Sequence, residues 1–167
     1  MSGSGNGNGN GRILCGGLLR RDQLAMIEFL GLDGEPGSAC GILERFGEAG
    51  IPLAYVSLGN GPDGQRNVAF CVDRVDLVTS RPLLETVEKE RRPVEVLIRE
   101  PVTKLTLYGP HFQEKHGLAA GVFAALCERG VKSHGISMSV NSISFVVDSR
   151  LCEEAVACLR LRFEWPE

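Results

Sequence analysis

Two carboxylates stand just before a run of small residues near position 35 of the chain. Asp33 and Glu35 precede a proline, and Gly37 with two further small residues follows it. If a helix begins here, its first N–H groups have no internal partner and attract a carboxylate, while a glycine lets a ligand approach the backbone. Asp33 and Glu35 could then hold an ammonium group, so the stretch 32–39 has the groups to bind an amino acid. The same residues also suit a tight turn with solvated carboxylates near a helix dipole, and both interpretations stay open.

A helix is predicted at this place because the stretch occurs twice. Residues 37–50, GSACGILERFGEAG, match residues 117–130, GLAAGVFAALCERG. In each copy four apolar residues recur at i, i+3, i+4 and i+7, which is typical of the apolar face of a helix. These residues are Ala39, Ile42, Leu43 and Phe46, then Ala119, Val122, Phe123 and Leu126. Both copies end at a glycine, Gly50 or Gly130, which favours a left-handed cap. A repeat of this length indicates two copies of one supersecondary unit.

The rest of the first copy is predicted from its apolar runs and turns. Strands are expected at residues 24–30, 51–58, 67–72 and 94–98, with an Asp-Gly turn at 63–64 joining the middle pair. A second helix is expected to open at the Thr-Ser-Arg-Pro sequence of residues 79–82. Residues 24–98 therefore have the order β-α-β-β-α-β of the ferredoxin-like unit.

The second copy lacks one strand of its own. Strands are expected at 103–108, 131–139 and 143–147, and Ser149 is expected to cap a last helix. A spare apolar segment, 13–19, is separated from the first unit by a polar turn at 20–22, and we expect it to complete the second unit; residues 161–163 are the alternative.

The predicted fold class is α+β: two ferredoxin-like βαββαβ units, the first inserted in the second, with antiparallel sheets and helices on one face. The domains would be a first unit at 24–98 and a second at 12–22 plus 99–164, after a flexible Gly/Ser/Asn tail at 1–11.

Composition excludes several classes of protein. The chain has 167 residues, 43% of them hydrophobic, and a net charge of −3, which argues against binding nucleic acid. No apolar run is long enough for a membrane span and no signal-peptide pattern appears, so we expect a cytoplasmic location. The six cysteines form no C-x-x-C pair and the three histidines show no ligand spacing, so we expect reduced thiols and neither metal nor cofactor.

The order and spacing of these segments resemble tandem ACT domains, and more closely the regulatory region of aspartate kinase. In the first unit the resemblance is carried by LGLDGEPG at 30–37, EAGIPL at 48–53 and PDG at 62–64; in the second it is carried by KLTLYG at 104–109, HGLAA at 116–120 and ISMSVNSISFVV at 136–147. It extends over about residues 13–163. The kinase half is absent from the sequence. Glu35 stands where that family has a lysine, Gly34 where it has an acid, and Leu58 where it often has a glutamine.

The resemblance implies an effector site for lysine or threonine in the first unit, with Asn141 and Ser142 closing it from the second. Its expected residues are Leu32, Asp33, Gly34, Glu35, Gly37, Ser38, Ala39, Leu58, Asn141 and Ser142. A second possible site comprises His111, Phe112, Gln113, Gly117 and Ala119.

The expected function is therefore allosteric feedback control by an amino acid without catalysis, in a homodimer or in a heteromer with a larger catalytic subunit. The alternatives are a generic dimerising ACT module for another enzyme, an RNA-binding ferredoxin-like module and an enzyme in its own right. RNA modules need aromatic residues on central strands and a basic face, which these strands lack. No Ser/His/Asp or Cys/His constellation has suggestive spacing.

Overall fold

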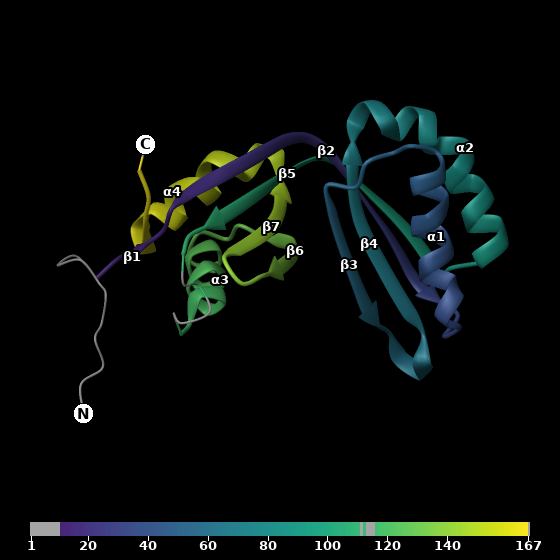
Figure 1. Ribbon diagram of the computed structural model, residues 1–167, viewed down its shortest axis with the longest axis horizontal. Helices are drawn as coiled ribbons and strands as arrows, with labels where there is room; N and C mark the ends of the chain where they lie inside the picture. The colour runs from purple at the N-terminus through teal and green to yellow at the C-terminus, as the bar shows by residue number, and fades with distance from the viewer. Residues whose placement is uncertain (1–10, 111, 113–115, 167) are drawn as a thin grey trace. The chain divides into compact units, whose positions relative to one another are not determined.

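The structure is a computed structural model that describes residues 11–110, 112 and 116–166. Contacts divide the chain into two compact units. The central unit, Gln23–Val102, is continuous in sequence, and the flanking unit contains residues up to Asp22 and from Thr103 onward. Figure 1 shows the course of the chain through both units.

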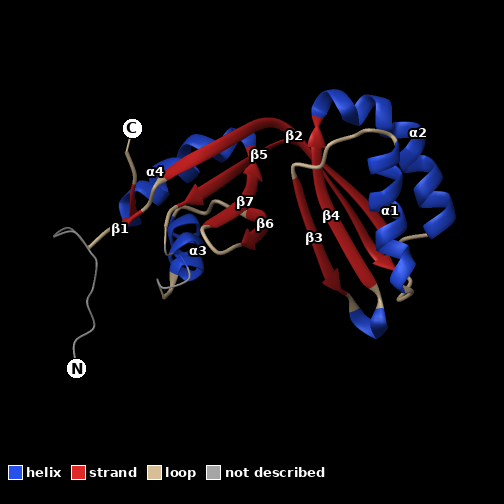
Figure 2. Cartoon of the chain, viewed as in Figure 1, coloured by secondary structure: helices blue, strands red, loops and turns tan. Residues whose placement is uncertain are grey.

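The central unit is a four-stranded antiparallel arrangement with two helices. It contains the second part of β2 (Gly17–Leu32), α1 (Pro36–Glu48), β3 (Tyr55–Asn60), the short helix η1 (Pro62–Gly64), β4 (Arg66–Asp73), α2 (Arg74–Arg91) and the first part of β5 (Glu95–Tyr108). Its strands lie in the order β3-β4-β2-β5. Figure 2 shows both helices beside the strands of this unit.

The helices of the central unit cover one face of its strands because apolar residues alternate along β2 and β4. Ile27 and Phe29 of β2 and Phe70 of β4 share a core with Phe46 of α1. The ring centroids of Phe46 and Phe70 lie 4.7 Å apart in an edge-to-face contact. The predicted apolar face of α1 is confirmed, since Ile42 and Phe46 have no exposed surface.

The flanking unit repeats the plan with shorter elements. It contains β1 (Ile13–Leu14), the remaining parts of β2 and β5, α3 (Leu118–Glu128), β6 (Ser133–Met138), β7 (Ser142–Asp148), the short helix η3 (Ser149–Leu151), α4 (Cys152–Arg162) and β8 (Phe163–Glu164). Its strands lie in the order β2-β5-β7-β6, and β1 pairs with β8 in a separate parallel pair. Leu105, Val122, Phe145 and Leu159 belong to its core.

The predicted turn at 20–22 is wrong, because β2 runs without interruption from Gly17 to Leu32. The charged residues that suggested a turn are paired. Arg20 donates to Asp22 at 2.7 Å, and Thr103 donates to the same carboxylate at 2.8 Å. Directly after these residues, Gln23 has a positive φ of 57° without interrupting the strand.

The two strands predicted at 94–98 and 103–108 are also one strand, β5. The charged residues between them are again paired: Arg99 donates to Glu28 at 2.8 Å, and Glu100 accepts from Arg74 at 3.0 Å. At 20–22 and again at 99–100, the charged residues are therefore paired side chains within a strand and do not form a loop.

The helix α2 begins at Arg74, earlier than the predicted start at 79, and Pro82 lies inside it. Proline cannot donate to the carbonyl four residues before it. In the turns before Pro82, two backbone carbonyl groups accept hydrogen bonds from side-chain hydroxyl groups. Thr79 donates to Asp76 O at 2.9 Å, and Ser80 donates to Leu77 O at 3.1 Å. The first strand of the central hairpin, β3, also differs from the prediction, because it begins at Tyr55 and not at residue 51.

The expectation that Ser149 caps the last helix by its side chain is wrong. Its hydroxyl lies 2.9 Å from that of Thr103, and α4 begins at Cys152 without a side-chain cap. The spare segment 13–19 is divided: Ile13–Leu14 pairs with Phe163–Glu164, and the residues from Gly17 belong to β2 beside β5. Of the alternative candidate, residues 161–163, only Phe163 lies in a strand, because Leu161 and Arg162 belong to the last turn of α4.

The predicted fold class is confirmed: the chain is α+β, with antiparallel strands and helices in ferredoxin-like units. The predicted left-handed caps are confirmed at Gly50, with φ 70°, and Gly130, with φ 68°. Among the described residues, no helix combines the length and the apolar character needed to cross a bilayer.

Candidate functional site

The loop before α1 is held by its own side chains. The Asp33 carboxylate accepts a hydrogen bond from the Ser38 hydroxyl and another from the Glu35 N–H at 3.3 Å. Ser38 is buried, with 1% of its surface exposed. Glu35 is the N-cap residue and is exposed, and its side chain makes no capping bond. Both carboxylates are exposed, but Asp33 orders the loop through its hydrogen bonds, whereas Glu35 makes no capping bond.

The two glycines of this loop have different surroundings. A Cβ on Gly34 would lie 2.6 Å from the carbonyl oxygen of Gly64 at the tip of the hairpin. A Cβ on Gly37 would meet nothing within 4 Å. Gly34 is therefore required by close packing, whereas Gly37 keeps the start of α1 open to approach.

A cavity of about 480 Å³ lies between the start of α1 and the hairpin formed by β3 and β4; we call it the α1 cavity. Ala39 and Leu58, both predicted site residues, line it. Leu58 is 62% exposed although it is a large apolar residue on an edge strand. The α1 cavity therefore has an apolar wall against which the apolar part of a ligand can pack.

The polar side of the α1 cavity comes from residues of the hairpin that were not predicted as site residues. Asn60, Arg66 and Asn67 line the cavity. Arg66 donates to the side-chain oxygen of Asn60 at 2.6 Å. Asn60 lies two residues beyond Leu58 on the same strand face, and Arg66 pairs with Asn60 across the hairpin. The period of two and the hairpin turn were the signals that could have located these residues.

Cys40 also lines the α1 cavity, but its environment disfavours a nucleophile. Its Sγ donates to the Glu44 carboxylate at 3.4 Å. This hydrogen bond and the negative charge of Glu44 raise the pKa of the Cys40 thiol above its ordinary value. A protonated thiol is a poor nucleophile, so we assign Cys40 no chemical role beyond lining the cavity.

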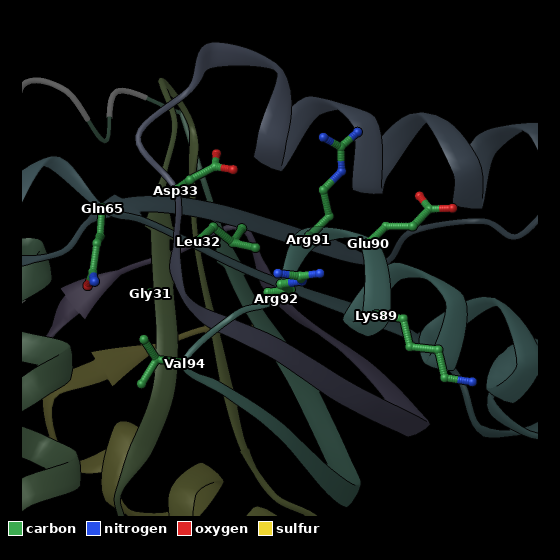
Figure 3. Close-up of a pocket in the computed structure, with 9 residues that line it drawn as sticks. All are labelled: Gly31, Leu32, Asp33, Gln65, Lys89, Glu90, Arg91, Arg92 and Val94. Atoms are coloured by element: carbon green, nitrogen blue, oxygen red, sulfur yellow. The ribbon is translucent and has the colours of Figure 1, made fainter.

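A second cavity, of about 650 Å³, lies on the other side of the same loop, at the end of α2; we call it the α2 cavity. Figure 3 shows its lining residues. Leu32 and Asp33, predicted as effector-binding residues, line this cavity and not the first one. Of the predicted loop residues, Leu32 and Asp33 thus line the α2 cavity and Ala39 lines the α1 cavity. The lining of neither cavity includes Gly34, Glu35, Gly37 or Ser38.

Asn141 and Ser142 lie in the hairpin of the flanking unit. The backbone oxygen of Asn141 accepts from the Gly109 N–H at 2.9 Å, and the hydroxyl of Ser142 lies 2.8 Å from that of Ser139. These contacts order the hairpin itself. The role of both residues in closing an effector site stays a prediction.

The second possible site is only partly described. His111 and Gln113 lie outside the described residues. Phe112 is fully buried in the core of the flanking unit, and Ala119 packs against the same core. Gly117 is the N-cap of α3, with φ 80°. Phe112 thus supports the fold below the loop, and Gly117 is fixed by its left-handed conformation.

Comparison with known proteins finds relatives of this fold. Residues 105–163 match the ACT domain family model. The chain resembles the tandem ACT regulatory region of aspartate kinases, as predicted. It is 26% identical over 152 residues to an aspartate kinase of Pseudomonas fluorescens, a match that covers 91% of this chain and 37% of that protein. The chain thus spans little more than a third of the length of this relative.

Solved structures show the same fold. The ligand-free regulatory subunit of aspartate kinase from Thermus thermophilus matches with a TM-score of 0.80 and 23% identity, over 90% of this chain and 99% of that chain. A structure of aspartokinase alpha and beta subunits matches with a TM-score of 0.79 and 24% identity, over 87% of this chain and 96% of that chain. The fold is that of the aspartate kinase regulatory subunit.

Proposed function

We propose that this chain is an amino-acid-binding regulatory module of an aspartate-kinase-like enzyme, with lysine or threonine as effector and no catalysis of its own. The observation that carries the proposal is the α1 cavity, where the open start of a helix meets an exposed apolar residue and the polar end of a hairpin. The first N–H groups of α1 are suited to an effector carboxylate. Gly37 and Ala39 leave that approach unobstructed.

The lining of the α1 cavity favours threonine over lysine. Its residues include Arg66, two asparagines and Leu58, and no carboxylate from the described part of the chain. A lysine side chain would bring a second ammonium group close to Arg66 without an acidic partner, which is unfavourable in a partly enclosed site. A threonine side chain offers a methyl group to Leu58 and a hydroxyl group to an asparagine. We therefore place threonine first.

The α-ammonium group of the effector needs an acceptor as well. Asp33 already accepts two hydrogen bonds within the loop, so it is not the best candidate. Glu35 is exposed at the N-cap position, and its carboxylate has no capping bond. We assign the ammonium group to Glu35, which does not itself line the α1 cavity but directly precedes the lining residue Pro36. The aspartate kinase family has a lysine at this position.

The module is proposed to act in a homodimer or with a larger catalytic subunit. The exposed apolar residues Val56 and Leu58 lie on β3, which is an edge strand. Edge strands with apolar side chains need cover. The match to a structure of aspartokinase alpha and beta subunits supports a catalytic partner.

Thermal unfolding with each of the twenty amino acids tests the proposal. Threonine at saturating concentration should raise the melting temperature, because a ligand that binds only the folded state adds about 1–3 kcal/mol of stability. Lysine should do so less. If no amino acid stabilises the chain at millimolar concentration, alone or with a co-purified larger subunit, the proposed function is wrong.

A further inference from the structure

The α2 cavity is lined by three cations and only two carboxylates. Lys89, Arg91 and Arg92 come from the end of α2 and the residue after it. The two carboxylates of the lining already have partners elsewhere. Glu90 accepts from Arg45 of α1, and Asp33 accepts from Ser38 in its own loop. Within the described residues, the three cations make no such ion pair. The cavity is therefore electropositive.

The position of Arg91 is permitted by a glycine on the neighbouring helix. A Cβ on Gly41 would lie 2.5 Å from the Arg91 guanidinium. Figure 3 shows the Arg91 side chain extended toward α1, while that of Lys89 points away to the outer side. Lys89 therefore lies at the rim, and Arg91 and Arg92, neighbours at the end of α2, are the remaining cations of the lining.

Arg92 has a backbone conformation that normally favours glycine. It ends α2 with φ 45° and ψ 54°, and its N–H caps the carbonyl of Glu88 at 2.9 Å. The ends of α1 and α3 have glycine in the corresponding left-handed position, at Gly50 and Gly130. A helix dipole explains cations in the last turn of α2, but it does not explain an arginine where the other helices have glycine.

We infer that the α2 cavity binds a small phosphorylated metabolite through Arg91 and Arg92. Guanidinium groups match the geometry of phosphate oxygens and form paired hydrogen bonds with them. Gln65 adds a neutral donor, and Leu32 and Val94 form an apolar wall for the organic part of the ligand. The volume of about 650 Å³ suits a metabolite larger than a free phosphate ion.

The site differs from the proposed amino-acid site in position and in chemistry. It lies at the end of α2, whereas the α1 cavity lies at the start of α1 against the hairpin. The two cavities share none of their lining residues, so each can be altered alone.

Isothermal titration of the whole chain with phenyl phosphate tests this inference, with phenol as the matched neutral probe. Phenyl phosphate should bind saturably and phenol should not. Arg91→Gln should weaken the binding by about tenfold or more, since a lost charged hydrogen bond has that size. Arg81→Gln is the matched control, because Arg81 is an exposed arginine of the same helix that does not line the cavity. It should change the affinity less than about twofold.

The Arg92→Gly variant tests whether the guanidinium group is needed for binding without lowering the stability of the fold. Glycine suits the left-handed cap, so the melting temperature without ligand should stay the same or rise. The affinity for phenyl phosphate should nevertheless fall by about tenfold or more. The inference is overturned if the unaltered chain shows no saturable binding, if Arg91→Gln and Arg92→Gly bind as tightly as the unaltered chain, or if Arg81→Gln weakens binding equally.

Discussion

The carboxylate of Asp33 accepts a hydrogen bond from the hydroxyl of Ser38, five residues later in the chain. This contact joins the end of β2 to the first turn of α1 and orders the loop between the two cavities. It shows that one of the two carboxylates that suggested a ligand site has a structural role, while the exposed Glu35 remains available.

Replacing Ser38 by alanine should destabilise the central unit. The change removes a hydrogen bond to a charged acceptor from a buried side chain, and we expect a loss of about 1–3 kcal/mol in the free energy of unfolding, measured with urea. The control is Glu35→Ala, which removes an exposed side chain without a capping bond and should cost less than about 0.5 kcal/mol. Equal losses in both variants would show that the Asp33–Ser38 contact does not stabilise the loop.

Gly34 and Gly37 should respond oppositely to a methyl group. Gly34→Ala places a Cβ against the Gly64 carbonyl and should cost about 1–3 kcal/mol. Gly37→Ala enters open space in the first turn of α1 and should be neutral or stabilise by up to about 1 kcal/mol. Urea unfolding of the two variants measures both effects, and a Gly34→Ala chain as stable as the unaltered one would contradict the close packing of the hairpin tip.

Leu58 should limit effector affinity. A glutamine at this position would offer a donor and an acceptor to the polar end of the ligand inside the α1 cavity. Leu58→Gln should therefore tighten threonine binding by about 0.5–1.5 kcal/mol, as measured by titration calorimetry. Val56→Gln is the comparison, because it adds the same group to the same edge strand outside the cavity lining. The assignment of Leu58 to the site fails if both variants bind threonine as the unaltered chain does.

Asp22 should give the flanking unit a pH-dependent stability. Burial opposes its ionisation, but hydrogen bonds from Thr103 and Arg20 outweigh that and lower its pKa below the ordinary value. Because the folded pKa is the lower one, the stabilisation is complete above the unfolded value of about 3.9 and is lost as the pH falls through the folded pKa. Asp22→Asn and Thr103→Val should both flatten this acid limb in urea unfolding. Limbs as steep as that of the unaltered chain would contradict the role of the pair.

The sequence was a good guide where periodicity decides the structure. The apolar residues of α1, such as Ile42 and Phe46, repeat with the period of a helix, and they are buried as that period predicts. Strand length could not be predicted, because Arg20 and Arg99 look like turn residues until their partners Asp22 and Glu28 are known. Those partners depend on side-chain placement, which local composition does not contain.

The candidate site was predicted only in outline for the same reason. Ala39 and Leu58 line the α1 cavity, as a site at the start of the helix requires. Arg66 could not be placed there without the register that pairs it with Asn60. Asp33 could not be assigned to the loop itself without knowing that Ser38 donates to it.

The most direct test of the proposed function is threonine binding by the Gly37→Val chain. A valine at the start of α1 adds an isopropyl group in the approach to the helix N–H groups, while the open space around its Cβ leaves the fold intact. Gly47→Val is the matched control, because Gly47 has equally open surroundings but lies in the last turn of the same helix, whereas Gly37 lies in the first turn between the lining residues Pro36 and Ala39. In titration calorimetry we predict that Gly47→Val binds threonine as the unaltered chain does and that Gly37→Val does not bind it. Undiminished binding by a folded Gly37→Val chain would contradict a site at the start of α1.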